Sequence, residues 1–371
     1  MRRPRAIPAI LAALTLLAAA CGDDDDAGGG GGNGGGGDDV LQVAFVYVGP
    51  IGDAGWTKRH DDGRKAVEEA LGDRVETTFV ESVAEGAPSE RTFEDLARQG
   101  NDLIFGTSFG YMDQMLAVAE EYPDVVFMHA TGFKVADNMG TYFGAAEEAR
   151  YLSGIAAGNA TTSGTIGYVA AFPIPEVLRG INAFTLGVRS VNPAATVQVS
   201  WTSTWFGPEI EKTAAETLLD TGVDVIAQHQ DTPSPGEAAG EAGAYWVGYN
   251  DDMSRFAPDA WLTGPIWDWG PYYIRTAEQV LDGTWESEQY YGTMADGLVS
   301  LAPFGDAVDQ ATRDLIDQTR AEIEDGTFQP FTGPIKAQDG TVKVPDGTSA
   351  TLEELLSMDY FVEGVIGSAT G

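Results

Sequence analysis

Residues 41–64 read LQVAFVYVGPIGDAGWTKRHDDGR, a strand-like apolar run followed by a Gly/Pro turn. Apolar side chains at helical spacing continue through residues 66–71, so the stretch predicts a strand–loop–helix unit. In open α/β sheets such loops lie at the carboxyl ends of strands, where ligands bind. The loop carries Asp53 and Trp56, and His60 follows one helical turn later. We therefore expect this loop to form one wall of a small-molecule site.

The first 39 residues are typical of an exported lipoprotein. Three arginines precede an apolar run that is too short to span a bilayer and ends at Cys21, the single cysteine of the chain. We interpret residues 1–21 as a lipoprotein signal peptide with its lipobox cysteine, which would be lipidated. Ordinary signal-peptidase cleavage beside an incidental cysteine is the alternative. Residues 22–39 are almost all Gly and Asp and predict a disordered tether.

The rest of the chain alternates strand-like and helix-like segments in two successive blocks. Repeated β-α units form parallel sheets covered by helices, so the fold class is α/β with two Rossmann-like lobes joined by a hinge. We predict an N-terminal lobe at residues 40–163, a C-terminal lobe at 164–283 and a crossover segment at 284–371 that completes both. Among the predicted elements are strands at 75–80, 165–170, 196–201 and 261–265, and helices at 147–160, 270–282 and 307–325.

The composition excludes several classes of partner. A formal net charge of −36 opposes binding to nucleic acid or to anionic lipid. This acidity fits either an exported protein of a GC-rich genome or adaptation to high salt. The chain has no dinucleotide fingerprint and no phosphate loop, and the adjacent pair Asp251-Asp252 lacks a second cluster at ligand spacing. We expect no cofactor and no metal.

Residues 106–110, GTSFG, fit the G-x-S-x-G pattern of a hydrolase nucleophile elbow between a predicted strand and a predicted helix. An esterase would also need a histidine late in the chain. The last histidine is His229, and no oxyanion-hole segment of the HGGG type is present. We expect no enzymatic activity and interpret Ser108 and Phe109 as a second ligand-facing loop; a secreted serine esterase using Ser108 is the alternative.

Aromatic residues fall repeatedly at predicted strand ends or in loops. Flat aromatic side chains stack on flat heterocycles, and each base–aromatic stack contributes about 1–3 kcal/mol. Several such residues together favour a stacking pocket over a series of isolated core positions. The aromatic residues in question are Trp56, Phe109, Trp205, Phe206, Trp267 and Trp269.

Carboxylates near these aromatics could accept hydrogen bonds from ring N–H groups or exocyclic amines. Asp53, Asp231 and Asp268 are the candidates, and each such bond contributes about 1.5–3 kcal/mol. A helix N-cap is the alternative for any one of them, most of all for Asp231 ahead of Thr232-Pro233. His60 either contacts the ligand or caps the first helical turn.

Several spaced motifs resemble the basic membrane protein family. This resemblance extends from Val40 to Glu286. It implies a type I periplasmic-binding fold and a substrate-binding lipoprotein of an ABC importer that recognises purine nucleosides or bases. The motifs are YVGPIGDAGWTKRHDDGR, VAEG, LIFGTSFGYM, TIGYVAAFPIPEVLRGINAF, VIAQHQDTP and WDWGPYY.

The resemblance carries over to individual positions. The family's first-loop aspartate and the aromatic after it fall on Asp53 and Trp56. Its third-strand loop falls on Ser108 and Phe109, and its second-lobe stacking aromatic falls on Trp205, with Phe206 as a competitor.

Two family features of nucleoside-binding members are missing. Their Gly-x-Asp segment, which contacts the ribose, reads Gly248-Tyr249-Asn250, and their sugar-binding lysine is absent from the segment 263–267. Because both ribose contacts are missing, the chain resembles the branch of the family that binds a free base such as adenine.

We hypothesise a lipid-anchored receptor in the cell envelope, a monomer, that captures a purine base between its lobes, with adenine as the favoured base, and delivers it to an ABC permease. Trp56 and Trp205 would stack on the base, with Trp269 nearby. Asp53, Asp231 and Asp268 would satisfy its edge donors, with Ser108 and Asn250 as further polar contacts. A receptor for a nucleoside, a sugar or an amino-acid-like ligand, and a sensory lipoprotein, are the remaining alternatives.

Overall fold

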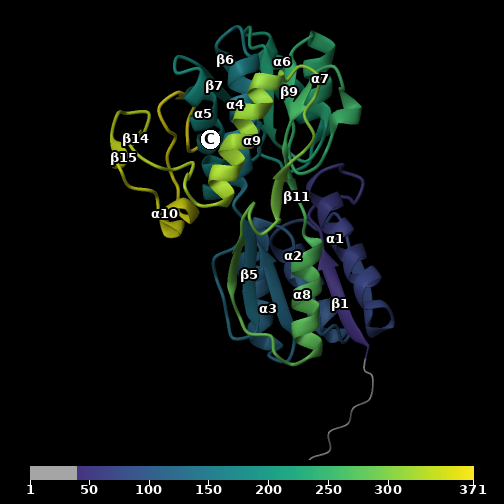
Figure 1. Cartoon of the computed structure of the whole chain (residues 1–371). Coiled ribbons are helices and arrows are strands. Elements are labelled where there is room, and N and C mark those ends of the chain that lie inside the picture. The colour runs from purple at the N-terminus through teal and green to yellow at the C-terminus, as the bar shows by residue number, and fades with distance from the viewer. Residues whose placement is uncertain (1–39) are drawn as a thin grey trace, which may run out of the picture. The chain divides into compact units, whose positions relative to one another are not determined.

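A computed structural model describes residues Val40–Gly371. The predicted signal peptide, the predicted lipidation site Cys21 and the predicted tether lie outside the described residues. Within them, two six-stranded parallel sheets confirm the predicted α/β fold class (Figure 1).

The first sheet has the strand order β12-β5-β4-β3-β1-β2. Successive residues of β1 lie on opposite faces of this sheet, because the side chains of a strand point alternately to its two sides. Val43 and Phe45 pack in the core with α1 and α8, whereas Ala44 and Val46 pack with α2 and α3. The elements of this lobe are β1 (Leu41–Val46), α1 (Trp56–Leu71), η1 (Gly72–Arg74), β2 (Val75–Val80), α2 (Ala87–Arg98), β3 (Leu103–Gly106), η2 (Phe109–Tyr111), α3 (Met112–Glu121), β4 (Val126–Ala130), β5 (Met139–Gly144), α8 (Gly270–Leu281) and β12 (Gln289–Gly292).

The second sheet has the order β10-β9-β8-β6-β7-β16. Core residues of α4 and α5 cover one face, and those of α6 and α7 cover the other. The elements of this lobe are α4 (Ala146–Ala160), β6 (Thr165–Ala170), α5 (Pro175–Val191), β7 (Thr196–Trp201), α6 (Pro208–Leu219), β8 (Val225–His229), α7 (Ser234–Ala242), β9 (Tyr245–Val247), η3 (Ser254–Phe256), β10 (Trp261–Thr263), α9 (Gln310–Glu324) and β16 (Val365–Ile366).

Short antiparallel pairs complete the molecule. β11 (Pro265–Trp267) pairs with β13 (Val299–Leu301), and β14 (Ile335–Lys336) pairs with β15 (Val342–Val344), followed by α10 (Leu352–Leu356). The predicted strands at 75–80, 165–170 and 196–201 have the observed bounds. The predicted strand at 261–265 is divided between β10 and β11. The predicted helix at 307–325 begins at Gln310, since the Asp309 side chain accepts from the backbone N–H of Thr312 and caps it.

The predicted lobe boundaries need correction. Helix α4 lies against α5 and α9 in the second lobe, and α8 lies against α1 and β1 in the first (Figure 1). The chain therefore crosses between lobes three times, after β5, before α8 and after β12, and residue 163 lies inside the second lobe. Glycines explain the placement of α4: a Cβ at Gly154 would lie 2.2 Å from the Phe184 carbonyl oxygen of α5. The absence of a side chain at Gly154 lets the backbone of α4 approach the backbone of α5 this closely.

Candidate ligand-binding site

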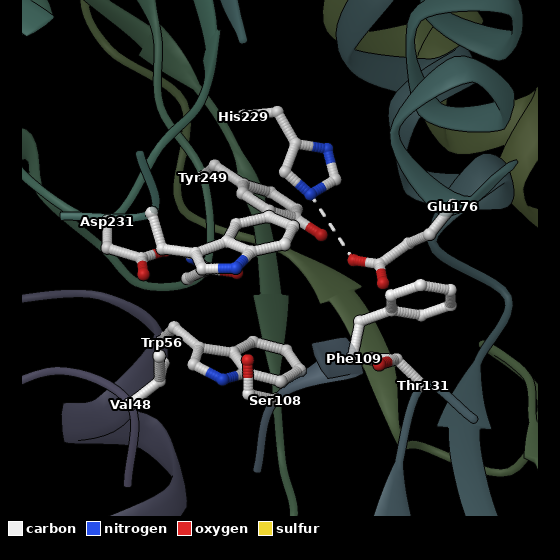
Figure 2. Close-up of a pocket in the computed structure, with 11 residues that line it drawn as sticks. Val48, Trp56, Ser108, Phe109, Thr131, Glu176, His229, Asp231 and Tyr249 are labelled. Atoms are coloured by element: carbon white, nitrogen blue, oxygen red, sulfur yellow. Dashed lines mark hydrogen bonds and ion pairs between the residues drawn. The ribbon is translucent and has the colours of Figure 1, made fainter. Parts of the chain in front are cut away.

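A pocket lies between the two lobes at the carboxyl ends of their parallel strands. Its empty volume, counted together with the solvent space at its mouth, is about 330 Å³. Figure 2 shows Trp56, Ser108 and Phe109 along one wall and Asp231, Tyr249 and His229 along the other. The lining residues are Val48, Trp56, Ser108, Phe109 and Thr131 of the first lobe and Glu176, Trp205, His229, Asp231, Tyr249 and Asn250 of the second.

Trp56 is held rigidly in the first-lobe wall. Its Nε1–H donates to the Thr107 carbonyl oxygen at 2.7 Å. Its ring meets the rings of His60 and Trp269 edge-on, with centroids 4.2 and 5.7 Å away. Since the indole N–H and one edge are already engaged, Trp56 offers the pocket apolar aromatic surface.

Trp205 lies in the second-lobe wall, in the loop between β7 and α6. Its Nε1–H donates to Glu85 Oε1 of the first lobe at 3.1 Å. The Ser108 hydroxyl donates to the same oxygen at 2.6 Å. Glu85 thus connects the lobes at the edge of the pocket and orients the Trp205 ring, whereas Phe206 is exposed and does not line this pocket.

Asp231 is an acidic group of the pocket with a single hydrogen-bond donor among residues 40–371. Its side chain is 4% exposed, and Asn250 Nδ2 donates to its Oδ1 at 3.1 Å. The Asn250 amide is itself oriented by Trp267, whose Nε1–H donates to Asn250 Oδ1 at 2.9 Å. Burial, and next the charge of Asp53, raise the pKa of Asp231 well above its usual value. Asp231 does not cap α7, whose N-terminus has no side-chain cap.

His229 and Glu176 form a second polar pair in the pocket. His229 Nε2 lies 3.3 Å from a Glu176 carboxylate oxygen (Figure 2). Burial lowers the pKa of His229 to about 4, so the ring is neutral at pH 7 and donates Nε2–H to Glu176. Sequence reasoning missed this pair, together with Val48, Thr131 and Tyr249. The strand-end rule could have found His229, because it is the last residue of β8.

Asp53 has a different role from the one predicted. Its carboxylate accepts from the backbone N–H groups of Gly55, Thr57 and Lys58 at 2.7–3.0 Å. It therefore caps the start of α1 and does not line the pocket. Burial raises the pKa of Asp53 to about 6 against the lowering effect of these bonds.

Three other predicted contacts also lie outside the pocket lining. The His60 ring stacks on Trp269 with centroids 4.7 Å apart, and both lie behind Trp56. The ring faces of His60 and Trp269, which were expected to contact a ligand, therefore pack against buried aromatic neighbours. Asp268 is exposed, and its carboxylate accepts from the Gly270 N–H at the start of α8. Of the ten predicted binding residues, the pocket brings together Trp56, Ser108, Phe109, Trp205, Asp231 and Asn250.

The lobes also meet beside the pocket. Lys58 Nζ lies 2.9 Å from Asp251 Oδ2 of the second lobe, and Arg59 Nε donates to the Trp267 carbonyl oxygen at 2.7 Å. Gly55 touches the second lobe even more tightly, because a Cβ there would lie 2.8 Å from the Asp231 carbonyl oxygen. These contacts describe a closed arrangement of the lobes.

A Gly55→Ala variant is expected to bind ligand about tenfold more weakly. The added methyl group would collide with backbone of the opposite lobe, and overpacking of this kind costs about 1–3 kcal/mol. Calorimetric titration checks the affinity, with Gly52→Ala as the matched control because nothing lies within 4 Å of its Cβ position. Unchanged affinity in Gly55→Ala, with normal thermal unfolding, would show that this close approach is not needed for binding.

The geometry around Ser108 is not that of a nucleophile elbow. The Ser108 hydroxyl donates to Glu85, and His129 Nε2 contacts the Ser108 carbonyl oxygen at 2.7 Å instead of the hydroxyl. Within residues 40–371, no group of three or more His, Cys, Asp or Glu side chains could hold a metal ion. No helix in this same part of the chain is long and apolar enough to cross a membrane.

Comparison with known proteins establishes the family. Residues 40–327 match the model of the Bmp family, described as "ABC transporter substrate-binding protein PnrA-like". The chain belongs to this family. As a Bmp protein it is an ABC transporter substrate-binding protein and not an enzyme, which implies a small-molecule ligand, a permease partner and a place in the cell envelope.

Two curated relatives of this Bmp protein cover most of its length. A purine-binding protein of Brucella abortus is 49% identical over 88% of this chain and 93% of the relative. A protein of Haloferax volcanii, provisionally named an ABC transporter glucose-binding protein, is 45% identical over 89% of this chain and 81% of the relative. A solute-binding protein of Aeropyrum pernix K1, 18% identical, superposes with a TM-score of 0.69 over 87% of this chain and all of that one, which supports the type I periplasmic-binding fold.

Proposed function

We propose that this Bmp protein captures a purine base, adenine, between its lobes and delivers it to an ABC permease. The observation that carries the proposal is the pair of indole rings, Trp56 and Trp205, that line one pocket from opposite lobes. Each stack on a base contributes about 1–3 kcal/mol. Closure then places aromatic surface from both lobes against one flat ligand.

The polar groups of the pocket also suit a heterocycle. Asp231 offers a carboxyl group with a single protein donor among the described residues. Purine edges present N–H groups and ring nitrogens that such a group can bind. The purine-binding relative from Brucella abortus supports the same ligand class.

The Haloferax volcanii relative favours glucose as a second candidate. A sugar would need several free donors and acceptors for its hydroxyl groups. In this pocket the Asn250 amide is engaged by Asp231 and Trp267, and the Ser108 hydroxyl is engaged by Glu85. Thr131 Oγ1, His229 Nδ1 and the Tyr249 hydroxyl have no partner within residues 40–371 and could meet ligand polar groups of either class. The preference for a purine therefore rests on the aromatic lining from Trp56 and Trp205.

Calorimetry of the purified protein against adenine, guanine, hypoxanthine, adenosine and glucose tests the proposal. We expect adenine to bind most tightly and glucose not to compete. Adenosine should bind more weakly, because the acid and the lysine that contact the ribose in nucleoside-binding members are missing from segments 248–250 and 263–267. Tighter binding of glucose than of any purine would overturn the proposal. Tighter binding of adenosine than of adenine would leave a purine site but overturn the preference for a free base.

We also propose that the protein is a monomer tethered to the membrane through lipidated Cys21. The signal-like residues 1–21 and the Gly/Asp-rich segment 22–39 support this anchor. A Cys21→Ser variant is expected to lose incorporation of labelled fatty acid and to leave the membrane fraction. Fatty-acid labelling that persists in Cys21→Ser would contradict the anchor.

A further inference from the structure

Asp231 lies among other acids, and it forms no ion pair with a cation of residues 40–371. It is affected by the charges of Asp53 before α1, Glu211 on α6 and Glu176 on α5. Lys58 and Arg59 of α1 face Asp251. Arg150 of α4 lies over the Tyr249 ring and donates to the Gln228 carbonyl oxygen. A buried carboxylate in such surroundings is costly, and one of two facing carboxyl groups takes up a proton.

The hydrogen bonds indicate which group takes the proton. Asp53 accepts from three backbone N–H groups, and Glu211 accepts from the N–H groups of Gly207 and Thr232 and from the Thr232 hydroxyl. Asp231 has one donor among the described residues, the Asn250 amide. Since each donor favours the charged form, Asp231 is more readily neutralised than Asp53 or Glu211. The raised pKa of Asp231 agrees with this assignment of the proton.

The same bonds indicate which oxygen carries the proton. Trp267 donates to Asn250 Oδ1, so the amide must present Nδ2–H to Asp231 Oδ1. Oδ1 therefore acts as the acceptor, as a carbonyl oxygen. Oδ2 receives no hydrogen bond from residues 40–371 and is free to carry the proton as a donor into the pocket.

We propose that Asp231 binds the base as a neutral carboxylic acid, donating Oδ2–H to a ring nitrogen and accepting an N–H on its other oxygen. This inference rests on the proposed purine function and defines the ligand class further. A neutral carboxyl matches a donor beside an acceptor, as adenine presents with its amino group and N7. An ionised carboxylate accepts from both oxygens and matches two adjacent donors instead. Asp231 is thus a specificity-determining residue for aminopurines.

Adenine titrations between pH 6 and pH 9 test the inference. The bound state requires the proton, so affinity should fall as the pH rises through the pKa of Asp231, by about tenfold per pH unit above it. Asp231→Asn should keep adenine affinity within about threefold of wild type at pH 6 and lose the pH dependence, because an amide also offers one donor and one acceptor. Asp231→Ala should bind at least tenfold more weakly at pH 6.

Two further variants separate the contribution of Asp231 to the pH dependence from that of other acids. Asp124→Asn, at an exposed acid before β4, is the matched control and should behave as wild type. Glu211→Gln removes a neighbouring acid whose carboxylate accepts three hydrogen bonds, and it should leave the pH dependence in place. Affinity that stays constant or rises with pH, or an Asp231→Asn protein that is folded but binds as weakly as Asp231→Ala, would overturn the inference. If the wild type binds no purine at any pH, the proposed function itself fails.

Discussion

A Trp205→Ala variant is expected to bind adenine at least tenfold more weakly than wild type, a loss of about 1.4 kcal/mol or more. Trp205 supplies aromatic surface of the second lobe to the pocket, and a base–aromatic stack contributes about 1–3 kcal/mol. The substitution also removes the N–H that donates to Glu85 across the lobes. Both losses act on the closed, liganded state, so the free energy of unfolding without ligand should change little.

Calorimetry measures the affinity, and chemical denaturation without ligand measures the stability. Trp285→Ala is the control, since Trp285 is also partly buried but lies outside the pocket lining. Trp205→Phe keeps an aromatic face without the N–H, so it separates stacking from the bond to Glu85. Adenine affinity that is unchanged in Trp205→Ala would remove the second-lobe stacking surface from the site.

A Trp269→Ala variant is expected to lose about 3–5 kcal/mol of stability. Trp269 is 1% exposed, and its ring stacks on Trp267 and His60 with centroids 4.9 and 4.7 Å away. Truncation would open a cavity behind Trp56 at the point where the chain crosses between lobes. Chemical denaturation measures the loss, which should appear without any ligand present.

Trp269→Phe gives the matched comparison. The Trp269 Nε1–H has no partner within residues 40–371, so phenylalanine sacrifices no hydrogen bond and leaves a smaller cavity. We expect Trp269→Phe to lose less stability and to keep adenine affinity within about threefold. A Trp269→Phe protein of normal stability whose adenine binding collapses would instead make Trp269 a direct ligand contact.

The fold class could be predicted because its signals are local. Apolar runs of strand length, such as 75–80 and 165–170, alternate with segments of helical spacing, and backbone hydrogen bonding leaves such segments few choices. The position of the site could also be predicted from local signals. Parallel strands place their carboxyl ends at one edge of a sheet, so Phe109, Trp205 and Asp231 could be assigned to that edge from their place after a strand.

The assignment of helices to lobes depended on tertiary structure. Helix α4 follows the first lobe in sequence but packs on α5 of the second, because Gly154 lets the two backbones approach closely. No periodicity within one helix identifies its partner, since that choice depends on a surface contributed by a distant segment.

Tertiary structure also decided the roles of the loop residues after the strands. The sequence by itself established that aromatic and acidic side chains gather at the strand ends. It did not establish which of them face the cavity. Asp53 is engaged by the N–H groups of α1, and Trp269 is covered by His60, so neither lines the pocket. A side chain's role depends on the donors and rings that compete for it, and distant segments bring those together only when the chain folds.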